Sequence, residues 1–191
     1  MSENPPERST RTLWLIAALC VAPVVASYLT YYFWQPAGQI NYGELLKAPP
    51  LPAASVKLAD GSAFELAALR GKWVLLMTDS AHCAEACERK LFMLRQLRLA
   101  QGKEMERIER AWLITDEGVL ADRLTENYRG TYFIRDGEGK LVKGLPDGRP
   151  AGESIYLIDP LGNIVLRYPS DADPRKVIKD IARLLKISGI G

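Results

Sequence analysis

The stretch WVLLMTDSAHCAEAC, residues 73–87, carries the strongest structural signal in this chain. It opens with five apolar residues, Trp73 to Met77, and such a short run is typical of a buried central strand. Two cysteines, Cys83 and Cys87, follow a polar turn and begin a segment with helical periodicity. The apolar positions that recur at helical spacing over residues 84–100 are Leu91, Phe92, Leu94 and Leu97. We therefore predict a strand that leads directly into a helix.

Strand and helix patterns continue on both sides of this stretch. Residues 56–58 and 63–66 flank a turn at Gly61 and predict a short hairpin. Downstream, the patterns predict a strand at 111–115, a helix at 119–127, a short strand at 132–134, a polar loop at 136–150, strands at 154–158 and 163–168 around a tight turn, and a helix that begins at Asp173-Pro174. This order of elements predicts an α/β domain with a mixed sheet covered by helices.

Composition limits the chemistry that such a domain can perform. The 191 residues include 25 basic and 23 acidic side chains, a formal charge of +2, so the chain lacks the basic excess of a nucleic-acid-binding protein. The single histidine, His82, excludes sites built from two or three imidazoles. Three cysteines are too few for a disulfide-stapled mini-domain or a four-thiolate zinc site. We expect no nucleic-acid partner. Any thiol or metal chemistry must use the three cysteines and the single histidine.

The N-terminal part of the chain differs sharply from the rest, because residues 12–43 carry no charge at all. Residues 13–34 are predominantly apolar and exceed the roughly 20 residues that a helix needs to cross a bilayer. Aromatic side chains gather at both ends of this run, as they do at the two membrane interfaces. We predict a transmembrane helix at 13–34. A signal peptide cleaved after a small-residue site at 24–26 is the alternative.

The flanks of this segment predict its orientation. Arginines precede it, whereas no basic residue follows before Lys47, so the positive-inside bias keeps a tail of residues 1–12 in the cytoplasm. Residues 35–54 contain four prolines and predict a semi-rigid linker. Residues 55–191 then form the α/β domain on the far side of the membrane. For a bacterial inner membrane, that side is the periplasm.

Cys83 and Cys87 are the candidate reactive groups. Four residues apart on a helix, they lie on the same face with Cα atoms about 6 Å apart, which a disulfide accepts. Cys83 falls near the helix start, where free backbone N–H groups and the helix dipole favour a thiolate. Two such thiolates also suit Cu(I). The alternative is a pair of buried structural cysteines. An oxidising extracytoplasmic compartment allows a reversible or a stable disulfide.

His82 is a weaker candidate for the same site. It directly precedes Cys83, so on a helix the two side chains point about 100° apart. From the preceding loop, its imidazole could bind a metal held by the thiolates, or promote the thiolate form when protonated. A solvent-exposed loop histidine is the alternative. The basic side chains of the following helix, Arg89, Lys90, Arg95 and Arg98, are expected to face solvent.

The strand, the Cys-x-x-x-Cys helix start and the later Ile155-Tyr156-Leu157-Ile158-Asp159-Pro160-Leu161-Gly162 hairpin resemble the SCO proteins. The resemblance extends over roughly residues 56–186 and includes the N-terminal anchor. It implies a thioredoxin-like fold, copper as cofactor or cargo, and a role in cytochrome c oxidase assembly as copper chaperone or thiol reductant. It also implies Cys83 and Cys87 as the redox or copper-binding residues. The implied partner is a respiratory oxidase subunit or another copper or thiol protein.

The chain departs from the SCO pattern at important positions. Prolines that usually follow each cysteine are replaced by Ala84 and Glu88, and the stretch 149–154 lacks the histidine that serves the family as third copper ligand. The three-ligand copper site is therefore incomplete. Thiol–disulfide exchange or transient Cu(I) handling through Cys83 and Cys87 remains the expected function. The alternative is a non-catalytic membrane assembly factor that uses the fold only to bind a partner.

Overall fold

The computed structural model describes residues 10–33, 41–47, 49–52, 54–137, 139–146 and 152–190, in two compact units that divide after Ile40. The first unit contains one helix, α1 (Thr10–Phe33), with Pro23 inside it and no buried residue. Its length and apolar composition make it a candidate membrane span, the only helix with these properties in the described part of the chain. Trp34, the last residue of the predicted span, lies outside the described residues.

The second unit is an α/β domain. Its described strands are β1 (Glu44–Leu45), β2 (Ser55–Leu58), β3 (Ala63–Glu65), β4 (Trp73–Asp79), β5 (Ile108–Ile114), β6 (Thr131–Arg135), β7 (Ser154–Ile158) and β8 (Ile164–Pro169). They form one sheet in the order β1-β8-β7-β4-β5-β6-β2-β3. The helices are α2 (Glu85–Leu99), α3 (Asp122–Asn127), α4 (Lys140–Gly144) and α5 (Pro174–Ile187), with 3-10 helices η1 (Leu66–Leu69) and η2 (Gly102–Arg107).

Strand β4 lies at the centre of the sheet, as its apolar run predicts. It pairs in parallel with β5 and antiparallel with β7, so the sheet is mixed. Alternate side chains of β4 enter opposite faces: Leu75 and Met77 join one hydrophobic cluster, and Val74 and Leu76 join the other. A strand buried on both faces reads as a continuous apolar run, which explains why the sequence pattern identified it.

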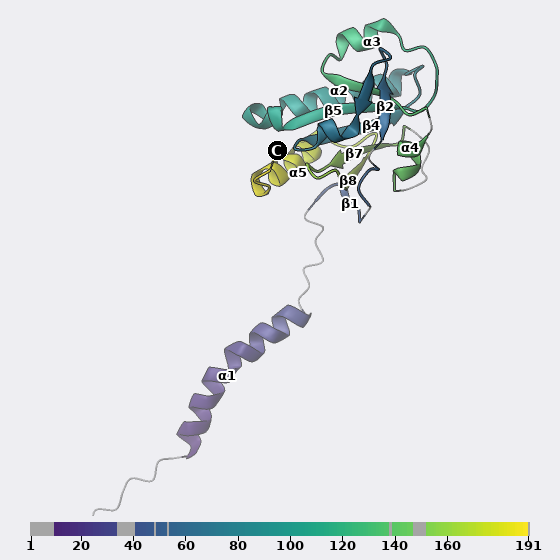
Figure 1. The fold of residues 1–191 in the computed structure, drawn as a ribbon. Coiled ribbons are helices and arrows are strands. Elements are labelled where there is room, and N and C mark those ends of the chain that lie inside the picture. The colour runs from purple at the N-terminus through teal and green to yellow at the C-terminus, as the bar shows by residue number, and fades with distance from the viewer. Residues whose placement is uncertain are drawn as a thin grey trace, which may run out of the picture. The chain divides into compact units, whose positions relative to one another are not determined.

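Helices cover both faces of the sheet (Figure 1). The face with Leu75 and Met77 packs against α2 and α5, and this cluster contains both cysteines. The opposite face is covered by η1, α4 and the chain around Leu51. The prediction of a mixed sheet flanked by helices is confirmed.

The structure differs from the sequence-based expectation in three segments. Part of the predicted linker joins the sheet, since β1 pairs antiparallel with the distant β8. Gly43 precedes β1 and lies so close to the Tyr168 ring that a Cβ atom would come within 2.5 Å of it. The loop predicted at 136–150 contains the short helix α4, and α3 begins at Asp122 rather than at residue 119. Sheet pairing across the chain leaves no local signal, so the linker prediction missed β1.

Candidate functional site

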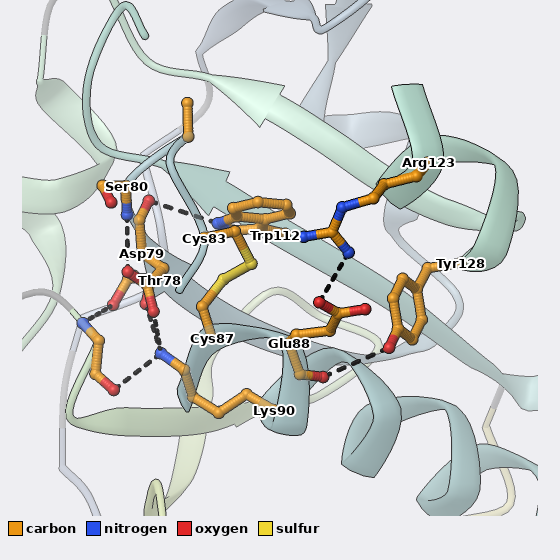
Figure 2. Close-up of a disulfide and its surroundings, with 12 residues drawn as sticks. Thr78, Asp79, Ser80, Cys83, Cys87, Glu88, Lys90, Trp112, Arg123 and Tyr128 are labelled. Carbon is orange, nitrogen blue, oxygen red and sulfur yellow. Dashed lines mark hydrogen bonds and ion pairs between the residues drawn. A yellow bond between two sulfur atoms is a disulfide. The ribbon is translucent and has the colours of Figure 1, made fainter. Parts of the chain in front are cut away.

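The two cysteines meet where β4 passes into α2. Their sulfur atoms form a disulfide, with the Cα atoms 5.0 Å apart (Figure 2). The helix begins later than the sequence suggests: Ala84 is its N-cap, so Cys83 belongs to the preceding turn and Cys87 to the first helical turn. The disulfide therefore joins the turn to the helix rather than linking two residues of one helix.

The backbone of Cys83 has an unusual conformation. Its φ of 41° makes it the non-glycine residue with positive φ among the described residues. Side-chain-bearing residues pay roughly 1–2 kcal/mol for the left-handed region, so the surrounding structure must hold the turn. One contribution is the bond from the Cys83 N–H to the Ser80 carbonyl, at 3.2 Å. No sequence motif predicts a positive φ at Cys83.

The N-terminus of α2 has no side-chain cap. Ala84 has no side-chain oxygen and makes no capping hydrogen bond to the first-turn N–H groups. These N–H groups and the helix dipole favour a negative charge close by. Reduction of the disulfide would place the Cys83 sulfur next to this end of the helix. The uncapped helix start is therefore adjacent to Cys83, as the sequence predicts for the more N-terminal cysteine.

The disulfide is enclosed. Cys83 and Cys87 are each 2% exposed and share a hydrophobic cluster with Ala81, Trp112 and Tyr128. The turn before Cys83 is held from a neighbouring loop by Asp116, whose Oδ1 accepts hydrogen bonds from the N–H groups of Ala81 (3.0 Å) and Gly118 (3.1 Å). A partner thiol therefore reaches the sulfur atoms only after a local opening.

Arg123 of α3 and Tyr128, the residue after α3, both contact Glu88 of α2, next to Cys87. Arg123 forms an ion pair with Glu88 at 2.8 Å, and the Tyr128 hydroxyl donates to the Glu88 carbonyl at 3.5 Å (Figure 2). Burial raises the pKa of Tyr128, and the charge of Glu88 adds to this effect, so the phenol stays protonated at neutral pH. These contacts connect α3 to α2 directly beside the disulfide.

We expect Arg123→Ala to speed chemical reduction of the disulfide. Loss of an ion pair this exposed costs about 1 kcal/mol or less, so the open population and the rate rise by up to about fivefold. The rate with a water-soluble phosphine, followed by alkylation and mass spectrometry, measures this. Arg89→Ala is the control, because Arg89 pairs with Glu85 on the solvent side of α2. Equal rates for the two variants would contradict the role of α3 as a cover.

A buried ion pair lies beside the disulfide (Figure 2). Lys90 is 2% exposed, and its Nζ contacts Asp79 Oδ2 at 2.7 Å. The same Nζ donates to the carbonyls of Thr78 (3.0 Å) and Gly152 (2.8 Å). The prediction that Lys90 faces solvent is wrong, although Arg89 and Arg95 are exposed as expected. Lys90 lies three residues after Cys87 and four before Leu94, which places it on the buried face of α2.

This pair fixes the loop that enters β7. Besides its bond to Lys90, Gly152 donates its N–H to Thr78 Oγ1 at 3.2 Å, and its φ is +101°. A Cβ at Gly152 would lie 3.3 Å from Asp79 Oδ2 and 3.5 Å from Lys90 Nζ. This is the stretch in which the resemblance to the SCO proteins implies a copper-ligand histidine, and residues 149–154 contain none. Here its described end is held by an ammonium group, while residues 147–151 lie outside the described residues.

The candidate donors for copper in the described residues are the two cysteine sulfur atoms. His82 is exposed between the buried Ala81 and Cys83. Within the described ranges, no group of three His, Cys, Asp or Glu side chains is placed to hold a metal ion. Because His82 is the one histidine of the chain, no other imidazole can complete the site. Once reduced, Cys83 and Cys87 would offer two soft thiolate ligands of the kind that suit Cu(I).

Comparison with known families identifies the domain. Residues 73–188 match the family described as "Transmembrane-like, thioredoxin-like, C-terminal domain". The chain belongs to this family. The matched range contains β4, both cysteines, Lys90 and α5, so the candidate site lies entirely within it. No curated protein matches the chain by sequence.

Solved structures show the same fold. ScoI of Bradyrhizobium japonicum with copper bound has 20% identity and a TM-score of 0.55, covering 71% of this chain and 99% of that chain. Yeast Sco1 has 13% identity and a TM-score of 0.59, over 73% and 99% of the two chains. The thioredoxin domain of a thiol-disulfide oxidoreductase from Bacteroides vulgatus has 18% identity and a TM-score of 0.54, over 74% and 99%. At these identities the likeness shows the thioredoxin-like fold, as the sequence predicts.

Proposed function

We propose that this chain is a membrane-anchored thiol–disulfide exchange protein that assists assembly of cytochrome c oxidase. This proposal is carried by the Cys83–Cys87 disulfide. It joins a turn to the uncapped start of α2, beside a thioredoxin-like sheet. Residues 13–34 form the anchor and residues 1–12 stay in the cytoplasm. The domain then lies on the periplasmic side of a bacterial inner membrane, joined through the proline-rich segment.

The exchange uses the two cysteines in different roles. In the reducing direction, the Cys83 thiolate attacks a substrate disulfide, forms a mixed disulfide and releases one substrate thiolate. The Cys87 thiolate then attacks the Cys83 sulfur, which releases the second substrate thiolate and closes the Cys83–Cys87 disulfide. Two electrons pass to the substrate, and its two thiolates take up protons from solvent. A dithiol protein of the envelope must then reduce Cys83–Cys87 by the reverse steps.

The substrate follows from the resemblance to the SCO proteins. It is a respiratory oxidase subunit, or another copper or thiol protein, whose cysteines have become oxidised. Neighbours with this fold include both copper-bound ScoI and a thiol-disulfide oxidoreductase. The incomplete set of copper ligands favours the exchange reaction. The buried ion pair also supports it, since Lys90 holds the loop that would otherwise carry a third ligand.

Transfer of Cu(I) is the second candidate function. The two cysteines, once reduced, form a soft ligand pair on adjacent turns of the chain, with Cα atoms 5.0 Å apart in the disulfide. Copper would be cargo, held by two thiolates and passed to the partner. Anaerobic titration of the reduced full-length chain against a competing Cu(I) chelator tests this role. If the copper stays with the chelator, the Cu(I)-transfer role is excluded.

Thiol trapping in membranes tests the exchange reaction. Cells that express the Cys20→Ser chain are quenched with acid and alkylated with a mass tag, so that only Cys83 and Cys87 report. We expect both reduced and oxidised forms, and the oxidised fraction rises when the envelope thiol reductants are removed. A pair that stays fully oxidised under every condition, with normal oxidase assembly in the Cys83→Ser/Cys87→Ser chain, would contradict the proposal. It would support the non-catalytic assembly factor instead.

A further inference from the structure

The solvent face of the C-terminal helix α5 is strongly basic. Its exposed side chains include Arg175, Lys176, Lys179, Arg183 and Lys186. Four of these five recur at spacings of four, four and three residues, which places them along one side of the helix. The acid within α5, Asp180, is 3% exposed and so does not contribute to the solvent face. Like charges one turn apart destabilise a helix, so this arrangement is not explained by helix stability.

The chain enters the folded unit directly beside this helix. The Gly43 N–H donates to Asp180 Oδ2 at 2.8 Å, and the Asp173 N–H donates to the Tyr42 hydroxyl at 3.3 Å. The ammonium group of Lys176 lies 5.0 Å from the centre of the Tyr42 ring. A glycine is required at position 43 because of the Tyr168 ring. The entry point is therefore fixed to α5 by buried and exposed contacts.

The connection to the candidate membrane helix is short. Eight peptide units join Phe33 to Asn41, and an extended chain of that length spans at most about 28 Å. If α1 crosses the membrane, as proposed above, Asn41, the residue before Tyr42, stays within this distance of the membrane surface. Charges on α5 can then come within the screening length of about 8 Å at physiological salt.

We propose that the basic face of α5 binds the headgroups of anionic phospholipids in the membrane that holds α1. The inference rests on the membrane anchoring in the proposed function. Binding is electrostatic and superficial, since the apolar face of α5, with Val177, Ile181 and Leu185, is buried in the core and cannot insert into lipid. The contact holds the domain at the membrane surface, where a membrane-embedded partner also lies.

Lysine accessibility in nanodiscs tests the proposal. The full-length chain is placed in nanodiscs of phosphatidylcholine, with or without a quarter of phosphatidylglycerol, and treated with a water-soluble acetylating reagent. We expect acetylation of Lys179 and Lys186 to fall by about threefold or more with the anionic lipid, and to recover in about 1 M salt. Lys57 is the internal control: it is exposed on β2, toward the sheet edge opposite β1, and its acetylation stays constant.

A charge-reversal variant supplies the second measurement. Lys179→Glu/Lys186→Glu is expected to abolish the lipid-dependent protection of Lys176 while thiol exchange by Cys83 and Cys87 is kept, and Lys57→Glu changes neither. Equal acetylation in the two kinds of nanodisc would overturn the proposal. So would protection in neutral lipid that grows with protein concentration, which indicates a second copy on this face. A chain that does not enter nanodiscs would overturn the anchoring as well, whereas protection without thiol exchange contradicts only the proposed function.

Discussion

Replacing Cys83 with serine is expected to abolish thiol–disulfide exchange. The rate with a disulfide substrate should fall by at least about a thousandfold, to that of the uncatalysed thiol reaction, because the attacking thiolate is gone. Cys87→Ser is expected to behave differently. It keeps the attacking thiolate but cannot resolve the intermediate, so it accumulates a mixed disulfide between Cys83 and the substrate. Non-reducing gels and mass spectrometry of the trapped species distinguish these results.

Two features of the chain make this comparison clean. Both variants lose the same short cross-link, worth about 2 kcal/mol, so a difference between them does not reflect stability. Cys20 lies in α1, outside the disulfide, and Cys20→Ser is expected to exchange like the unaltered chain. Trapping through Cys87 in the Cys83→Ser chain would reverse the assigned roles. Undiminished exchange in either variant would exclude the mechanism.

The buried ion pair predicts an unequal effect of removing its two members. Asp79→Asn leaves the Lys90 ammonium buried without a counter-charge and is expected to cost about 3 kcal/mol of unfolding free energy. Lys90→Met is expected to cost only about 1–2 kcal/mol. The methionine fills the space, and Asp79, whose side chain is 21% exposed, can bind water; the loss is mainly the donor to two carbonyls. Urea unfolding of the full-length variants measures both values.

Amide hydrogen exchange shows which part of the structure is loosened when Lys90 is replaced. The Gly152 N–H, which bonds to Thr78 Oγ1, should exchange faster in Lys90→Met because the loop before β7 loses its attachment to Lys90. Arg89→Met is the matched control on the same helix. Its exposed ion pair with Glu85 should be worth less than about 1 kcal/mol, and Gly152 should be unaffected. A larger loss for Lys90→Met than for Asp79→Asn would contradict this account of the pair.

Much of the fold follows from local sequence patterns. The apolar run of β4 identifies the central strand, and Asp173-Pro174 marks the start of α5, where the Asp173 carboxylate accepts a hydrogen bond from the Arg175 N–H at 2.9 Å. The spacing of Cys83 and Cys87 also predicted that a disulfide could join them. These features depend on residues close together in the chain, where periodicity and capping preferences act directly.

The character of the site was decided by contacts between distant residues. Helical spacing already places Lys90 on the buried face of α2, yet a lysine is expected in water unless a partner offsets its desolvation. That partner, Asp79, and the Gly152 carbonyl come from separate segments and meet Lys90 only in the folded sheet. The pairing of β1 with β8 is likewise invisible in the sequence around Glu44. Sequence alone identified elements such as β4 and α5 and the candidate cysteine pair; what surrounds the pair depends on the tertiary structure, because burial and charge compensation depend on the whole fold.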